Sequence, residues 1–196
     1  LEIVEGIGNR ETAANLHNEI GALEERQGRF PVALARYKQA LAILGELGDQ
    51  RALAESYNNV GFAYYQLGDY GNAGVYAQQS MQLYEKAENR EGQMYAGQTA
   101  GLLALARGDW VQAEKSYLRV LELAREFQDP LTEGLALGQP GRVAQYRGSY
   151  GAALASIRQG LAALEKSGDT RAIIELTLFE ADLALEVGML DDGRKA

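Results

Sequence analysis

The chain has 196 residues, of which 46% are hydrophobic and 23% charged, and this mixture excludes an intrinsically disordered protein. The formal net charge is −8 without a basic stripe, which excludes a nucleic-acid partner and favours basic or neutral ones. The sequence contains no cysteine, which excludes disulfides and thiolate metal sites, and no apolar run approaches the ~20 residues that span a bilayer.

The same residue types recur every 40 residues along the chain. Four columns share this spacing: the aromatics Phe30, Tyr70, Trp110 and Tyr150; the glycines Gly28, Gly68, Gly108, Gly148 and Gly188 two residues earlier; the alanines Ala33, Ala73, Ala113 and Ala153; and a second glycine set, Gly21, Gly61, Gly101 and Gly141. No insertion interrupts the register, so the pattern indicates an internal structural repeat.

Each repeat predicts two helices joined by a short turn. In the second repeat, apolar residues recur at steps of three and four over 51–67, and a second helix is expected over 71–87. Gly68 suits the left-handed position that ends the first of them. We predict units at 10–49, 50–89, 90–129 and 130–169 and a truncated unit at 170–196, forming one array over 1–196. Residues 1–7 are expected to be the tail of a preceding helix.

Two places depart from the regular pattern. Pro140 lies inside a predicted helix, where it lacks a backbone donor and clashes with the preceding turn, so we expect a kink near residues 136–138. The final predicted helix, 172–187, is rich in Ile, Leu and Phe and has no polar cap, whereas a terminal repeat normally needs one. We therefore expect the chain to form a homodimer through this helix or to have it covered by further sequence.

The second repeat carries the signature of a known family: Tyr57, Val60-Gly61, Tyr64, Gly68-Asp69-Tyr70 and Ala73. This pattern resembles the tetratricopeptide repeat, although the period here is 40 residues and not the usual ~34. The longer form is similar to the repeats of Pins/LGN scaffolds, kinesin light chains, Rap regulators and MalT-like sensor arms. The resemblance implies an all-α fold, a right-handed α–α superhelical solenoid of helix-turn-helix repeats.

The resemblance also implies a non-catalytic scaffold that binds a protein or peptide in a concave groove lined by the first helix of each pair. The groove positions carried over from the family are Asn15, Asn18, Arg26, Asn58, Asn59, Phe62, Tyr65, Tyr95, Gln98, Leu102, Arg142 and Gln145. These positions vary between repeats while the packing columns do not. Aromatic anchors surrounded by amides suit a peptide, because Asn and Gln both donate and accept hydrogen bonds.

The residues offer no catalytic centre, and we expect neither an enzyme activity, a cofactor nor a metal. The chain has no phosphate-binding loop or nucleophile elbow, and its only histidine, His17, falls in a packing column. Three alternatives remain: the groove aromatics complete the packing of adjacent helices, the chain is the effector-sensing arm of a signalling ATPase or transcription regulator, or it is a self-association module. The resemblance and the lack of cysteine predict a bacterial cytoplasmic location without membrane contact.

Overall fold

The computed structural model describes residues 10–195, with side chains described as far as residue 188, so the predicted helix tail at 1–7 lies outside the described residues. The described part consists of helices and turns and contains no strand. The helices are α2 (Arg10–Arg26), α3 (Phe30–Leu47), α4 (Gln50–Gln66), α5 (Tyr70–Lys86), α6 (Arg90–Ala106), α7 (Trp110–Glu126), α8 (Pro130–Gly138), α9 (Pro140–Tyr146), α10 (Tyr150–Ser167) and α11 (Thr170–Lys195). The all-α fold class expected from the repeat is confirmed.

Several helices end at glycines with a left-handed backbone, and several begin after a capping side chain. Gly68 has a φ of 77°, a left-handed conformation that glycine adopts without steric cost. The following Asp69 accepts a hydrogen bond from the backbone nitrogen of Asn72 at 3.1 Å, so it caps α5. Asp109 caps α7 in the same way, through the backbone nitrogen of Gln112 at 3.0 Å. At these turns the glycine ends one helix and the aspartate starts the next, whereas α3 and α10 begin without a side-chain cap.

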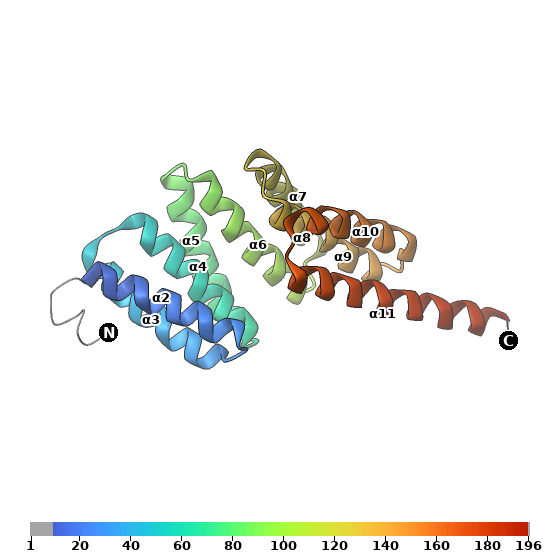
Figure 1. Cartoon of the computed structure of the whole chain (residues 1–196), viewed down its shortest axis with the longest axis horizontal. Helices are drawn as coiled ribbons and strands as arrows, with labels where there is room; N and C mark the ends of the chain where they lie inside the picture. Colours follow the sequence, from blue (N-terminus) through green and yellow to red (C-terminus); the bar gives the residue numbers. More distant parts are fainter. Residues whose placement is uncertain (1–9, 196) are drawn as a thin grey trace. The chain divides into compact units, whose positions relative to one another are not determined.

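Small residues bring the paired helices together, as the columns predict. Ala33, Ala73, Ala113 and Ala153 are all completely buried. A Cβ atom on Gly61 would lie 3.1 Å from the backbone nitrogen of Ala77, so glycine lets α4 approach the backbone of α5. In Figure 1 α2 lies beside α3 and α4 beside α5, and the core residues lie between these pairs.

The chain divides into two compact units, Leu1–Arg107 and Gly108–Ala196. The first contains α2 to α6, and its cores form around Leu44, Val60 and Tyr84. The second contains α7 to α11 and has a larger core that includes Ile157 and Leu183. The expectation that all repeats form one array stays a prediction.

The interruption at Pro140 lies slightly later than the sequence predicts. Helix α8 ends at Gly138 and α9 begins at Pro140, with a single turn residue, Gln139, between them. Gln139 still donates its backbone N–H to Leu135 at 3.0 Å, whereas Pro140 has no N–H to continue the series. The helix is therefore interrupted at Gln139 and not at residues 136–138, but Gln139 keeps a helical backbone with a φ of −62° and a ψ of −37°, so the expected kink stays a prediction.

The turn predicted at Gly188 is wrong. Helix α11 continues through this position as far as Lys195, where the repeat register predicted a turn and the start of a second helix. In the register, Met189 stands where Arg29, Asp69, Asp109 and Ser149 stand in the earlier repeats, and of these the two aspartates cap the next helix with their side chains. Methionine has no oxygen that could form such a cap, so this signal for a new helix start is missing at Met189.

Candidate binding groove

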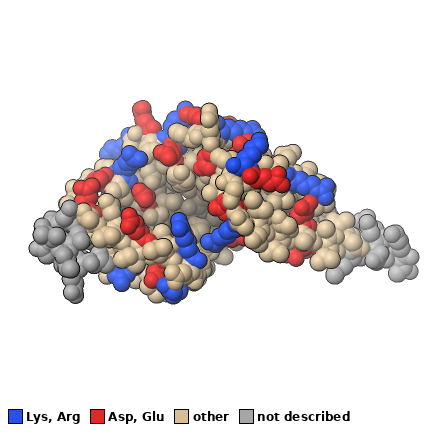
Figure 2. All heavy atoms as spheres, viewed as in Figure 1, with Lys and Arg blue, Asp and Glu red and all other residues tan. Residues whose placement is uncertain are grey.

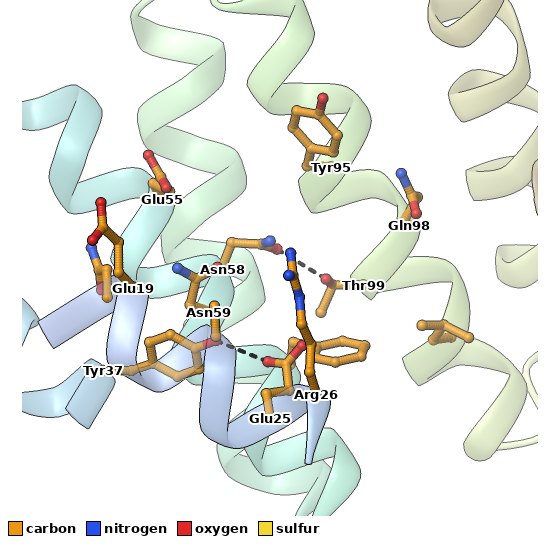
Figure 3. A pocket seen from close by; sticks show the side chains of 14 residues that line it. Glu19, Glu25, Arg26, Tyr37, Glu55, Asn58, Asn59, Tyr95, Gln98 and Thr99 are labelled. Atoms are coloured by element: carbon orange, nitrogen blue, oxygen red, sulfur yellow. Dashed lines mark hydrogen bonds between the residues drawn. The ribbon is translucent and has the colours of Figure 1, made fainter. Parts of the chain in front are cut away.

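The first helices of the unit Leu1–Arg107 enclose an open cavity of about 440 Å³ (Figure 3). It is lined by Asn18, Glu19, Ala22, Glu25, Arg26, Tyr37, Glu55, Asn58, Asn59, Phe62, Tyr95, Gln98, Thr99 and Leu102. All but Tyr37 come from α2, α4 and α6. These are the first helices of successive pairs, so one repeated face supplies nearly the whole wall.

A second cavity of about 400 Å³ adjoins the first. It is lined by Arg51, Glu55, Asn58, Asn59, Tyr84, Asn89, Glu91, Gly92 and Tyr95, and four of these residues also line the first cavity. We call the two cavities together the binding groove. It runs along α4 and α6 from their N-terminal turns to Phe62 and Leu102.

Hydrogen bonds between neighbouring first helices hold part of the groove in place. The Thr99 hydroxyl donates to Asn58 Oδ1 at 2.9 Å, which joins α6 to α4. Asn18 Nδ2 donates to the Ser56 hydroxyl at 3.1 Å, which joins α2 to α4. The Asn59 side chain makes no hydrogen bond to any described residue, so its amide can donate to and accept from a ligand.

Tyr37 lines the first cavity but was not among the expected groove positions, because it lies on α3, a second helix. Its ring occupies the space that Gly21 leaves open, since a Cβ atom on Gly21 would lie 2.6 Å from Tyr37 Cε1. Its hydroxyl donates to Glu25 Oε2 at 3.0 Å. Burial raises the pKa of Tyr37, and the charge of Glu25 raises it further, so this hydroxyl stays protonated as a donor. The glycine column was the available signal, because each of its glycines indicates close approach by an atom of the partner helix, which is the Tyr37 ring at Gly21 and the α5 backbone at Gly61.

Tyr84 closes the second cavity in a similar way. A Cβ atom on Gly92 would lie 2.1 Å from Tyr84 Cδ1, so only glycine admits this ring. Burial raises the pKa of Tyr84 to about 12, with the charge of Glu55 as the next largest cause. Two second-helix tyrosines therefore reach the groove through glycine gaps.

The structure brings eight of the twelve expected groove residues together. Asn18, Arg26, Asn58, Asn59, Phe62, Tyr95, Gln98 and Leu102 all line the first cavity. Asn15 and Tyr65 line neither cavity, and the Tyr65 ring lies 6.0 Å from that of Phe62 and 5.9 Å from that of Tyr70.

The other two expected residues belong to the unit Gly108–Ala196. The Arg142 guanidinium lies over the Phe179 ring, 4.7 Å from its centroid. Gln145 Nε2 donates to Glu186 Oε2 at 2.9 Å. Both side chains therefore contact α11. His17, expected to pack and not to bind, is 4% exposed.

These helix pairs repeat in register, and one helix of each pair in the unit Leu1–Arg107 faces the groove. This arrangement is that of a helical-repeat scaffold. Two family models, both described as tetratricopeptide repeat, match residues 11–86 and 100–131, which together make up more than half of the chain. The chain belongs to the tetratricopeptide-repeat family. No curated protein sequence matches it.

Solved structures share the fold at low sequence identity. A Rap protein complexed with Competence and Sporulation Factor has a TM-score of 0.83 at 19% identity, over 93% of this chain and 51% of that one. A STAND protein with a tetratricopeptide repeat sensor from Pyrococcus horikoshii has a TM-score of 0.72 at 21% identity, over 89% of this chain and 27% of that one. A kinesin light chain from Podosopora anserina with nearly identical TPR-like repeats has a TM-score of 0.68 at 14% identity, over 94% of this chain and 92% of that one.

This chain therefore spans about half of the Rap protein and about a quarter of the STAND protein. At such identities the likeness shows the fold alone. Tetratricopeptide repeats build surfaces for protein–protein interaction, and that general role holds for this chain. Among the helices that the structure describes, none combines the length and the apolarity needed to cross a membrane.

Proposed function

We propose that the binding groove holds an extended peptide segment of a partner protein and that the chain acts without catalysis. The observation that carries this proposal is the first cavity itself, in which Phe62 and Leu102 lie beside the amides of Asn59 and Gln98. Apolar side chains supply affinity when a ligand covers them. Amides pair with the backbone groups of a bound peptide, which otherwise lose their hydrogen bonds to water.

An effector-sensing arm is the first alternative, and the similarity to the STAND protein's repeat sensor supports it. A small effector favours a closed, mainly apolar pocket with a few polar groups. The groove here is open and lined mostly by polar side chains, and it continues along α4 and α6 into the second cavity. An elongated ligand fits this form better, so we favour a peptide.

Removal of two aromatic groove residues tests the proposal. Peptides selected from a random phage-displayed library on the wild-type chain are expected to bind a Phe62→Ala, Tyr95→Ala variant at least about thirtyfold more weakly, because a single buried anchor contributes roughly 2 kcal/mol. The measurement is the Kd of synthetic peptides by fluorescence anisotropy, with circular dichroism to show that the variant is folded.

The matched control is Tyr146→Ala in the other unit, where the tyrosine is 71% exposed and lies outside the groove. Its affinity for the same peptides is expected to equal that of the wild type. Peptides that bind the groove variant as tightly as the wild type, or that lose affinity only in the control, would show that the groove is not the binding site.

Self-association through α11 is a second candidate, supported by the exposure of its apolar residues. Ile174 is 53% exposed, although the equivalent Ala14, Ala54 and Met94 are buried. Leu178 is 61% exposed one turn further along. A second copy of the chain could cover this face, because isologous contact pairs identical apolar stripes.

Light scattering coupled to gel filtration distinguishes the two surfaces. If α11 mediates a dimer, an Ile174→Glu, Leu178→Glu variant is expected to be monomeric, because association would bury the new charges. A Phe62→Ala, Tyr65→Ala variant is then expected to remain dimeric. A monomeric wild type would remove the second candidate, and a groove variant that alone becomes monomeric would make the groove the self-association surface.

A further inference from the structure

The charges of the binding groove are unbalanced. Its lining includes four carboxylates, Glu19, Glu25, Glu55 and Glu91, against two guanidinium groups, Arg26 and Arg51. Figure 2 shows acidic and basic side chains interspersed over the visible face of the molecule, so charge is not simply segregated there. The groove shares the excess of negative charge of the whole chain, and its own carboxylates bear on what it binds.

The four carboxylates differ in their surroundings. Glu25 accepts a hydrogen bond from the Tyr37 hydroxyl and is followed in the sequence by Arg26, so one end of the groove carries both signs of charge. Glu19 and Glu55 are exposed and form no ion pair with any described residue. Glu91 is exposed and without an ion pair in the same way but lines only the second cavity, so Glu19 and Glu55 are the carboxylates available to a ligand in the first cavity.

Glu19 and Glu55 line the same cavity although they come from different helices. The hydrogen bond from Asn18 to Ser56 joins α2 to α4 at this point, with 3.1 Å between Nδ2 and Oγ. Glu19 follows Asn18 and Glu55 precedes Ser56, so the two carboxylates flank the bond. Figure 3 shows both on the same side of the pocket, with Tyr95 and Gln98 on the other wall.

The apolar part of the groove lies at a defined distance from these carboxylates. Phe62 follows Glu55 by seven residues on α4, which corresponds to roughly 10 Å along a helix. An extended peptide covers that distance in about three residues. Leu102 of α6 lines the same cavity as Phe62, so an apolar ligand side chain can contact both.

We propose that the groove selects a peptide with a basic side chain placed between Glu19 and Glu55 and an apolar side chain about three residues away, against Phe62 and Leu102. This inference rests on the proposed function and adds the charge of the ligand. An acidic peptide would bring its carboxylates to the side of the groove that is already negative. A basic ligand gains from both these carboxylates and the net charge of −8 of the chain.

The test uses three labelled pools of short peptides with blocked ends. Each pool has a fixed phenylalanine and, about three positions from it, a fixed lysine, glutamine or glutamate, with uncharged residues elsewhere. Fluorescence anisotropy measures the Kd of each pool for the wild type, for a Glu19→Gln, Glu55→Gln variant and for a Glu85→Gln, Glu165→Gln variant. The Glu85→Gln, Glu165→Gln variant is the control, because it changes the net charge by the same amount at two exposed positions outside the groove.

The lysine pool is expected to bind the wild type most tightly and the Glu19→Gln, Glu55→Gln variant about five- to tenfold more weakly, while the glutamine pool changes little. The control variant is expected to keep the lysine preference, and added salt to reduce it. A wild type that binds the glutamine or glutamate pool equally well overturns this inference but leaves peptide binding intact. If both variants lose the preference for the lysine pool equally, the preference comes from the net charge of the chain, and the inference is also overturned. If no pool binds the wild type, both the inference and the proposed peptide-binding function fail.

Discussion

A Gly160→Ala variant is expected to lower the free energy of unfolding of the unit Gly108–Ala196 by about 3 kcal/mol. A Cβ atom on Gly160 would lie 2.7 Å from the carbonyl oxygen of Gly134 and 3.0 Å from the backbone nitrogen of Gly138. These are backbone atoms of the neighbouring helix, which cannot rotate away as a side chain can. Accommodating one methyl group therefore requires α8 and α10 to separate, which weakens their packing.

Urea unfolding followed by tryptophan fluorescence measures this effect. Trp110 is the only tryptophan of the chain, and its ring stacks on that of Tyr146 with 4.6 Å between centroids, so its emission reports on the same unit. The matched control is Gly151→Ala in the same helix, where no atom lies within 4 Å of an added Cβ. It is expected to raise stability by up to ~0.5 kcal/mol, because alanine favours the helix. Equal losses in both variants would contradict the close-approach explanation.

The second large effect is a coupling between Gly138 and Leu176. The three heavy atoms nearest to a Cβ on Gly138 all belong to the Leu176 side chain, the closest at 2.8 Å. Leu176→Ala alone is expected to cost about 3 kcal/mol by leaving a cavity, and Gly138→Ala alone about 2 kcal/mol by overpacking. In the double variant the new methyl group occupies part of the space that the leucine leaves. The double variant is therefore expected to lose less free energy of unfolding than the sum of the two single losses, by about 1 to 2 kcal/mol.

A second double variant provides the control for this coupling. Gly160→Ala combined with Leu176→Ala also removes a side-chain contact, since a Cβ on Gly160 lies 2.8 Å from Leu176 Cδ2. The contacts with the backbone of α8 remain, so the losses are expected to be close to additive. The same urea titration gives all of these values. The proposed difference between side-chain and backbone contacts would be wrong in either of two cases. The stability losses of Gly138→Ala and Leu176→Ala could prove additive, or the Gly160→Ala, Leu176→Ala variant could recover as much stability as the Gly138→Ala, Leu176→Ala variant.

The helix pairs could be predicted from the sequence because the repeat supplies the same information several times. One repeat places an apolar face, a left-handed glycine and a capping aspartate, and the others confirm the register. The break at Pro140 was predictable for a different reason, since the missing N–H is a local chemical property. Gly188 shows the limit of the register, because its position matched while the capping residue after it did not.

The groove was predictable in part. The expected first-helix positions of the first three repeats, except Asn15 and Tyr65, line the first cavity. The register treats every repeat alike, so it could not show that Arg142 and Gln145 belong to the other unit. Tyr37 was missed because its column contains Tyr37, Ala77, Tyr117 and Ile157, and this mixture shows no periodic signal. Which second-helix side chain reaches the groove depends on the glycine opposite it.

The entry of Tyr37 through the Gly21 gap bears on how ligand preference can evolve in such proteins. The ring forms part of the cavity wall, yet both the glycine that admits it and the helix that carries it belong to the packing layer. An exchange at either position reshapes the cavity while every first-helix side chain facing it is unchanged. Divergence in specificity can therefore begin behind the surface, at sites that a comparison of contact residues between paralogues would overlook.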